Sequence, residues 1–173
     1  TPLHIVCGSN FSVKTFRLLI QNGAKLNPSS TVSNSPLHKT CDDTARMEMA
    51  KILIKKGADI NARGLYKWTP LHYAANFNRI KYVKLLVENG ADINAIDADG
   101  NTPLALAYNS IFGNESKDYL KSKNASDKGL EKLSLYEQFC VADDTETLKS
   151  ILNKGFNVNQ TNYRKSTVLH HSC

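Results

Sequence analysis

The sequence is poor in the features that mark membrane proteins, small secreted domains and metal sites. No stretch of its 173 residues approaches the roughly 18 to 20 consecutive apolar positions of a membrane-spanning helix, and Thr1 opens no charged-then-apolar leader. The four cysteines are too few for a disulfide-stapled module, and no two of them have the C-x-x-C spacing of a zinc or redox site. The sequence therefore predicts a soluble chain without a membrane span.

A concentrated block of charge and the common catalytic motifs are also missing. The 22 basic residues outnumber the 16 acidic ones, but they are scattered along the sequence. A nucleic-acid-binding protein usually concentrates its basic residues on one stripe, so nucleic-acid binding is disfavoured. The sequence has no phosphate-binding glycine loop, paired-carboxylate motif or H-E-x-x-H helix. We therefore expect no enzyme activity, no small-molecule substrate and no cofactor.

What the sequence does contain is an internal repeat with a period of about 33 residues. The tetrapeptide Thr1-Pro2-Leu3-His4 returns unchanged at Thr69 and in variant form at Ser35, Thr102 and Thr167. The last interval is close to two periods, so we expect a divergent copy that begins near Ser134. A second motif recurs in phase with the first, as in Gly57-Ala58-Asp59-Ile60-Asn61, at residues 23–27, 57–61, 90–94 and 155–159.

Each copy predicts two helices followed by a loop. Pro fits the first turn of a helix because its missing N–H would be unpaired there, and the preceding Thr or Ser can cap that helix. Apolar residues then recur at helical spacing, as at Val83, Leu86 and Val87, and each run stops at a Gly that suits a left-handed C-cap. The following residues, rich in Asn, Asp, Gly and Ser, predict an extended finger with a tight turn. One such unit cannot bury its own apolar face, so stability must come from stacked neighbours.

Two motifs locked to one period make the sequence resemble the ankyrin repeat family over essentially its whole length. The resemblance implies an all-α repeat solenoid, an ankyrin stack of helix-turn-helix units with β-hairpin fingers, with about five units plus a partial one. The expected units span residues 1–30, 31–63, 64–97, 98–129 (divergent), 130–161 and 162–173 (partial). Because neither end carries a polar capping unit, we expect residues 1–173 to form one array that is a fragment of a longer protein.

The fourth unit departs most from the pattern, because Ala105 replaces the histidine and no G-A-D-I-N follows. Tyr119 and Leu120 are expected to close its second helix, with Asn124 in the left-handed position that Gly usually fills. The polar run at residues 113–132 favours an eroded repeat with a longer loop. The alternatives are a shortened finger, a hinge, a distinct binding loop or a seam between two sub-arrays.

The histidines and cysteines follow the phase of the repeat. One position of the unit is occupied by His4, His38, His72 and His170. Stacking would spread these rings into a ladder, too far apart to share a metal ion, and the resemblance implies that each bonds the backbone of an adjoining finger. Another position, where a small buried residue is expected, is occupied by Cys7, Cys41, Cys140 and Cys173. We therefore predict structural roles for both residue types and no metal site.

By resemblance, partners meet the stack on its concave side, through finger tips and the exposed surface of the first helices. Interface hot spots are enriched in Trp and Tyr, so Tyr66, Trp68 and Phe77 are the best candidate anchor. The alternative is that these rings only cover the gap between neighbouring fingers. Equivalent positions in other units are mostly small or polar, at Thr31, Val32, Asn34, Asn162, Tyr163 and Ser166. The candidate partner-binding residues are Leu65, Tyr66, Trp68, Asn76, Phe77, Asp99 and Asn101.

Two finger asparagines are candidates for modification. Asn61 and Asn94 each follow Asp-Ile and have a Leu eight residues earlier, a pattern that resembles the substrates of asparaginyl hydroxylases. The sequence therefore predicts possible hydroxylation at these two residues.

The leading hypothesis is a non-catalytic protein–protein interaction module whose concave ankyrin surface docks a macromolecular partner. The alternative is a targeting or scaffolding segment of a larger enzyme, toxin, channel or host-directed effector whose activity lies outside these residues. A third hypothesis, nucleic-acid binding through the lysines, predicts an affinity that falls steeply with salt. The expected setting is intracellular, and cytoplasmic rather than nuclear.

Overall fold

The computed structural model describes residues 1–9, 11–27, 34–41, 44–108, 110, 113–126, 128, 145–155 and 157. The chain forms two units, Thr1–Asp127 and Lys128–Cys173, which we call unit 1 and unit 2 and describe separately. In unit 2 the described part is the helix α10 (Thr145–Asn153), in which Ile151 is buried. Most of the repeats predicted at 130–161 and 162–173, with His170, Cys140 and Cys173, lies outside the described residues.

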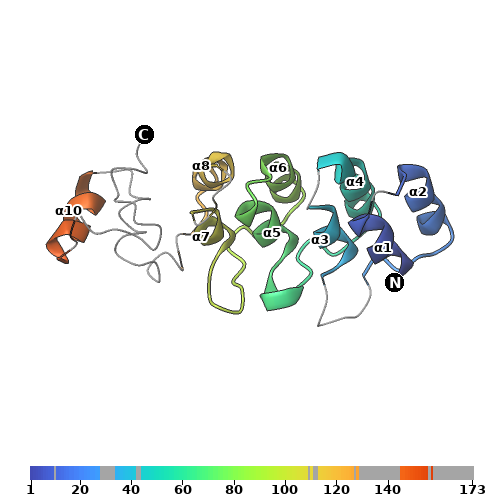
Figure 1. Ribbon diagram of the computed structural model, residues 1–173, viewed down its shortest axis with the longest axis horizontal. Helices are drawn as coiled ribbons and strands as arrows, with labels where there is room; N and C mark the ends of the chain where they lie inside the picture. The colour runs from blue at the N-terminus through green and yellow to red at the C-terminus, as the bar shows by residue number, and fades with distance from the viewer. Residues whose placement is uncertain are drawn as a thin grey trace. The chain divides into compact units, whose positions relative to one another are not determined.

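Unit 1 is a series of helix pairs (Figure 1). The first helices are α1 (Pro2–Gly8), α3 (Pro36–Thr40), α5 (Pro70–Asn76) and α7 (Pro103–Tyr108). The second helices are α2 (Val13–Gln21), α4 (Met47–Lys55), α6 (Ile80–Glu88) and α8 (Glu115–Ser122). Short 3-10 turns lie at η1 (Thr44–Arg46) and η2 (Leu65–Lys67). The described residues contain helices and no β-strand, so the β-hairpin form of the fingers and the full unit count stay predictions.

The helices form two rows in unit 1 (Figure 1). The first helices pack side by side in sequence order, α1 on α3, α3 on α5 and α5 on α7, and each also packs on its own second helix. The loops that precede α5 and α7 project on the side of the first helices, which we call the finger side. An array of this kind places the loops and first helices of successive repeats along one continuous surface.

The first helices begin as the sequence predicts. Pro stands in the first turn of α1, α3 and α5, and Thr1, Ser35 and Thr69 are their N-cap residues. In each case the N-cap hydroxyl pairs with the histidine three residues later, which completes a capping box. The tetrapeptide is therefore both a helix start and the source of the histidine ladder.

The core of unit 1 is built from the repeated positions. The motif leucines Leu3, Leu37, Leu71 and Leu104 are all buried, as are Cys7, Cys41 and Ala75 at the predicted small-residue position. The second helices contribute Phe16, Met49, Ala50, Leu53, Tyr82, Val83, Leu86 and Leu120. These residues form one continuous cluster, so each pair is stabilised by its neighbours.

The second helices end in a recurring left-handed cap. The backbone φ is 76° at Gly23, 87° at Gly57 and 89° at Gly90. Asn124 takes the same place after α8 with φ of 55°, as predicted. The amide of the next residue, Ala125, donates to Leu120 O at 3.1 Å, matching the bond from Ala91 to Leu86 O at 3.0 Å. The predicted second helix of the divergent repeat is confirmed.

The polar run at 113–132 is therefore not a loop throughout, since α8 lies within it. The variability of surface loops favours an eroded repeat with a longer loop here, but α8 is a helix of eight residues in which Ser116 and Leu120 are buried. The boundary between units 1 and 2 also falls inside this run.

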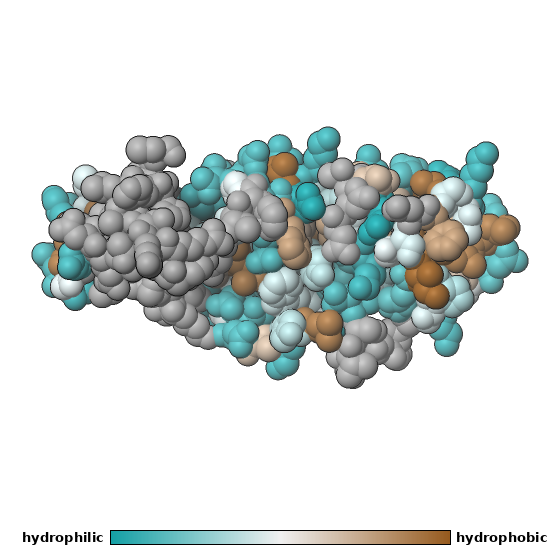
Figure 2. All heavy atoms as spheres, in the orientation of Figure 1, coloured by the Kyte–Doolittle hydropathy of each residue, from teal (hydrophilic) through white to brown (hydrophobic). Residues whose placement is uncertain are grey.

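One end of unit 1, formed by α1 and α2, exposes apolar side chains (Figure 2). Ile5 and Leu18 are 62% and 59% exposed. The residues equivalent to Leu18 in later repeats, Ile52, Leu85 and Tyr119, all pack against the core. Among the described residues, no helix is long and apolar enough to cross a membrane.

Candidate partner-binding surface

The loop before α5, residues 63–68, is a tight finger. Gly64 N–H donates to Trp68 O at 2.8 Å and closes the turn, and Tyr66 and Lys67 both have φ of 55°. The Arg63 guanidinium lies at the base, with Nη1 3.0 Å from Lys67 O and 2.5 Å from Ile96 O. A left-handed conformation at two consecutive non-glycine residues is costly, so these bonds must hold it in place.

Neighbouring loops pin the finger on both sides. On one side, Asn34 Oδ1 accepts the Leu65 N–H at 3.1 Å. A side chain at Gly64 would collide with that same oxygen, so only glycine lets Asn34 approach. On the other side, Ala98 N–H donates to Tyr66 O at 2.8 Å. The fingers therefore form one connected layer.

The next finger, residues 97–101, is organised by the Asp97 carboxylate, which is 5% exposed. It accepts hydrogen bonds from the backbone N–H groups of Asp99 and Asn101, at 2.9 and 2.8 Å. It also accepts the indole N–H of Trp68 at 3.1 Å and a bond from the Asn101 side chain at 3.3 Å. A buried carboxylate with four donors is well compensated, so Asp97 fixes both its own turn and the Trp68 ring.

Four rings from the finger and α5 form a continuous cluster. Ring centroids are 6.4 Å apart for Tyr66 and Trp68, 5.7 Å for Trp68 and Tyr73, and 5.2 Å for Tyr73 and Phe77. The Trp68 and Tyr73 rings meet edge to face, a favourable arrangement. The three predicted anchor residues are thus brought together, and Tyr73 joins them.

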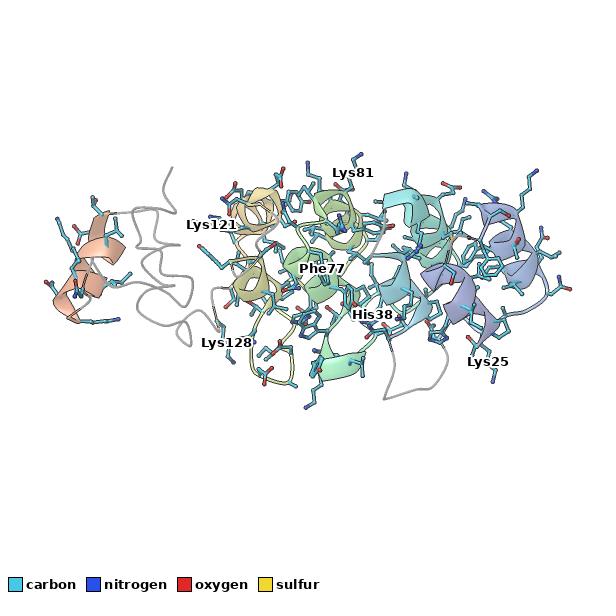
Figure 3. The ribbon with its side chains drawn as sticks, in the orientation of Figure 1. Lys25, His38, Phe77, Lys81, Lys121 and Lys128 are labelled. Atoms are coloured by element: carbon cyan, nitrogen blue, oxygen red, sulfur yellow. The ribbon has the colours of Figure 1, made fainter. Side chains whose placement is uncertain are left out.

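The predicted binding residues differ in exposure. Tyr66 and Leu65 at the tip are 72% and 48% exposed, and Asp99 is also exposed. Trp68, Asn76, Phe77 and Asn101 are half-buried. Figure 3 labels Phe77, the residue that follows the last residue of α5. Of the equivalent positions, Asn34 is buried, while Thr31, Val32, Asn162, Tyr163 and Ser166 lie outside the described residues.

Asp97 and Tyr73 are the site residues that the sequence reasoning missed. Asp97 opens an Asp-x-x-Gly turn, a signal that could have been recognised. Tyr73 directly follows the ladder histidine, at the position that points toward the preceding repeat, where it meets the His38 ring edge to face.

The histidine ladder also connects the loops. Nδ1 of His38 accepts the Ser35 N–H at 3.1 Å, which leaves the proton on Nε2, and this atom donates to Trp68 O at 2.9 Å. In the same way, His72 Nε2 donates to Asn101 O at 3.1 Å. Burial lowers the pKa of His38 to about 4 and also lowers the pKa of His72. The predicted structural role is confirmed for both.

A second ladder runs through the finger asparagines. Asn27 Oδ1 accepts the Asp59 N–H at 2.7 Å, and Asn61 Oδ1 accepts the Asp92 N–H at 2.8 Å. Asn94 Oδ1 accepts the Ser126 N–H at 2.7 Å, which extends the pattern into the divergent repeat. Each asparagine therefore joins one loop to the next.

The two described cysteines, Cys7 and Cys41, are buried in the core. Burial raises the pKa of Cys7 to about 12, so its nucleophilic thiolate is scarce at neutral pH. In the part of the chain that the structure describes, no group of three or more His, Cys, Asp or Glu residues could hold a metal ion.

Stacked helix pairs with loops joined in a continuous layer define a repeat solenoid, a class that presents extended binding surfaces. Residues 47–131 match the family model described as ankyrin repeats (3 copies), so this chain carries ankyrin repeats and that segment belongs to the ankyrin repeat family. Members of this family are generally protein–protein interaction modules and are typically non-catalytic. No curated protein matches the chain.

Proposed function

We propose that unit 1 is a non-catalytic interaction module whose finger side, the concave side of an ankyrin stack, docks a macromolecular partner. The proposed contact surface comprises Leu65, Tyr66, Trp68, Asn76, Phe77, Asp99 and Asn101. Tyr66, Leu65 and Asp99 contact the partner directly, because they are exposed. The half-buried residues support them and complete the surface.

One observation carries the proposal: two large side chains, Leu65 and Tyr66, stand exposed on a loop that is fixed from both sides. A loop of this kind has already lost its conformational freedom during folding, so little ordering cost remains on binding. Burying a ring such as Tyr66 in a partner contributes about 2 kcal/mol. The rings of Trp68, Tyr73 and Phe77, which form one cluster with Tyr66, give the partner a rigid contact surface.

The test compares Tyr66→Ala with Leu18→Ala, which removes an exposed apolar side chain from α2, far from the fingers in the fold. The partner is first captured with wild-type protein from an extract of the natural source, purified, and titrated by calorimetry. Tyr66→Ala should weaken binding by tens of fold, and Leu18→Ala should not. Equal affinity of the two variants, with unchanged melting temperatures, would overturn the proposal.

Trp68 needs a separate variant, because it also bonds Asp97. Trp68→Phe keeps an aromatic ring against Tyr73 but cannot donate to the carboxylate. If Trp68 contacts the partner mainly through its ring, the affinity of Trp68→Phe should lie between those of wild type and Trp68→Ala.

We also propose the repeat boundaries 1–30, 31–63, 64–97 and 98–129 for unit 1. Each range holds one described helix pair, which supports it. For 130–161 the support is α10 followed by Gly155, whose φ is 87° as after the other second helices. The range 162–173 lies outside the described residues.

A further proposal concerns Asn61 and Asn94 as hydroxylation sites. The reaction inserts one atom of dioxygen into a Cβ–H bond of asparagine, while a reducing co-substrate of the modifying enzyme takes the other atom. Exposure of Asn94 and partial exposure of Asn61 support access. Asn27 occupies the same ladder but follows Lys-Leu, which makes it the internal control. Mass spectrometry of the natural protein should find one added oxygen at Asn61 or Asn94, and its absence from both would refute the proposal.

The proposed setting is intracellular, and cytoplasmic rather than nuclear. The Cys7 thiol, which forms no disulfide, supports it, because reduced cysteines are the norm where glutathione and thioredoxin operate. Fractionation of the natural source followed by immunodetection tests this setting.

A further inference from the structure

The charged side chains of unit 1 are distributed unevenly between the finger side and the opposite side, which the second helices form. Three consecutive second helices carry exposed basic residues, and we call this set the outer basic face: Lys14, Arg17, Lys51, Lys55, Lys81 and Lys84. Arg17, Lys51 and Lys84 occupy one equivalent position of the repeat, and the other three stand three or four positions away from it. Acidic residues on the same three helices are Glu48 and Glu88. On the finger side, described acidic and basic residues balance, with Asp59, Asp92, Asp97 and Asp99 against Lys25, Lys39, Arg63 and Lys67. The basic surplus of these repeats therefore lies on the outer side.

Helical geometry places the six residues on one surface. The buried residues of α4 and α6, such as Leu53 and Leu86, turn toward the core. Lys51 and Lys55, and likewise Lys81 and Lys84, stand three or four positions apart on the opposite stripe. The second helices lie side by side in one row (Figure 1), and hydrophilic residues line this edge in Figure 2. In Figure 3, Lys81 projects from this edge, whereas Lys25 lies at the opposite edge.

Most of this charge is uncompensated within the protein. Arg17 pairs with Glu48 at 3.0 Å, and both side chains are more than half exposed. Within the described part of the chain, no ion pair involves Lys14, Lys51 or Lys81. Like charges at helical spacing, as at Lys51 and Lys55, repel each other and cost helix stability. An anionic ligand would relieve this repulsion.

We propose that the outer basic face docks unit 1 on an anionic lipid surface. Four to eight Lys or Arg residues on one helical surface are sufficient for attraction to anionic headgroups. Attraction to anionic headgroups depends on positive charge distributed over an extended surface and does not require a shaped pocket. The three adjacent second helices supply such a surface. Lysine is well suited to this role, because its ammonium group is a flexible point charge that can approach a headgroup without a fixed bonding geometry.

A single-stranded nucleic acid is the less favoured occupant, because it would also require exposed rings on which bases stack. The aromatic residues within α2, α4 and α6 are Phe16 and Tyr82, and both are buried. Tyr119 on α8 is half-buried, and the ammonium groups of Lys84 and Lys123 each lie 5.6 Å from its ring centroid. Docking through the outer basic face leaves the finger side open, so lipid and protein partner can be bound together. The proposal is independent of the partner-binding surface.

The test is sedimentation of the full chain with vesicles of phosphatidylcholine alone and of phosphatidylcholine with 30% phosphatidylserine. Lys51→Glu/Lys81→Glu reverses two charges on the outer basic face, and Lys25→Glu/Lys67→Glu reverses two exposed charges on the finger side. Both variants change net charge equally, so they separate the face from the overall charge. Circular dichroism melting verifies that each variant is folded.

We expect wild type to bind the anionic vesicles selectively and to dissociate in high salt. The outer variant should lose at least about tenfold in partition coefficient, and the finger-side variant should stay within about threefold. Equal losses in the two variants, or no preference for anionic vesicles, would overturn the proposal. Tighter binding of a single-stranded or duplex oligonucleotide than of vesicles in the same buffer, lost in the outer variant, would assign the face to nucleic acid instead.

Discussion

His38 Nε2 lies 2.9 Å from the carbonyl oxygen of Trp68, so that a side chain of one repeat holds the loop of the next. Nδ1 of the same ring accepts the Ser35 N–H, and this second bond requires that Nδ1 carry no proton. Protonating His38 would set a new N–H against that donor in a buried site. The Ser35–His38 contact at the start of α3, which positions the ring, is therefore sensitive to acid.

We expect the stability of unit 1 to fall as the pH drops from 6.5 toward 4. The ordinary pKa of 6.5 applies to the unfolded chain, and the pKa of folded His38 is about 4, so the unfolded chain binds more protons in this window. His38 alone then contributes about 3 kcal/mol at neutral pH that is lost below pH 4. His72, whose pKa is also lowered by burial, acts in the same direction.

Urea denaturation across this pH range measures the effect, and His38→Gln is the control. The variant should be less stable at pH 7 but should lose less stability on acidification than wild type. Parallel pH profiles for the two proteins would show that His38 does not carry the effect.

Removing the Asp97 carboxylate should lower the free energy of unfolding far more than removing the neighbouring Asp99 carboxylate. Asp97→Ala leaves the Trp68 indole N–H and two backbone N–H groups without their acceptor, so we expect a loss of about 2 to 4 kcal/mol. Asp99→Ala removes an exposed carboxylate and should change stability by less than about 0.5 kcal/mol. Similar unfolding midpoints in urea for both variants would contradict the role given to Asp97.

Gly64→Ala should be strongly destabilising, although Gly64 has an ordinary negative φ of −99°. The added Cβ would collide with Asn34 Oδ1 and lie 3.2 Å from His38 Nε2. We expect a cost of about 2 kcal/mol or more, partly recovered in Gly64→Ala/Asn34→Ala, where the colliding oxygen is removed. Gly8→Ala is the matched control, since its Cβ would meet only Lys39 Cδ at 3.7 Å. That helical substitution should leave the melting temperature unchanged or raised.

Asn124→Gly should stabilise the divergent repeat. Asn124 has φ of 55°, where glycine carries no steric penalty, so we expect a gain of about 0.5 kcal/mol. Lys123→Gly, one residue earlier at φ of −99°, should instead lower stability. Thermal melts of the two variants distinguish them, and a shift of both in the same direction would argue against a left-handed cap at Asn124.

Much of the fold can be predicted from short local motifs that are visible in the sequence. The Thr/Ser-Pro pair starts the first helices, and glycine ends the second helices, because capping and left-handed φ depend on a few neighbouring residues. The period then carries these rules from repeat to repeat. Even Asn124 could be assigned in this way, since its place in the period and its tolerance of positive φ agree.

The surface was less predictable. The lysines of the outer basic face look scattered along the chain, and only the period combined with helical spacing brings them to one side. The sequence predicts Trp68 as part of a partner-binding anchor, but its ring is half-buried, and its indole N–H donates to the Asp97 carboxylate 29 residues away. The repeat pattern alone cannot distinguish an exposed aromatic ring from one that is hydrogen-bonded to a neighbouring loop.

The sequence by itself thus determined the repeat, its helices and the structural positions of His38, His72 and Asn124, because these depend on local backbone chemistry and on a period. The tertiary structure decided which finger residues are exposed, that Asp97 and Tyr73 contact Trp68, and that Gly64 makes room for Asn34. Those outcomes depend on contacts between loops about 30 residues apart, and such contacts are set by the stacking distance between repeats rather than by any local preference.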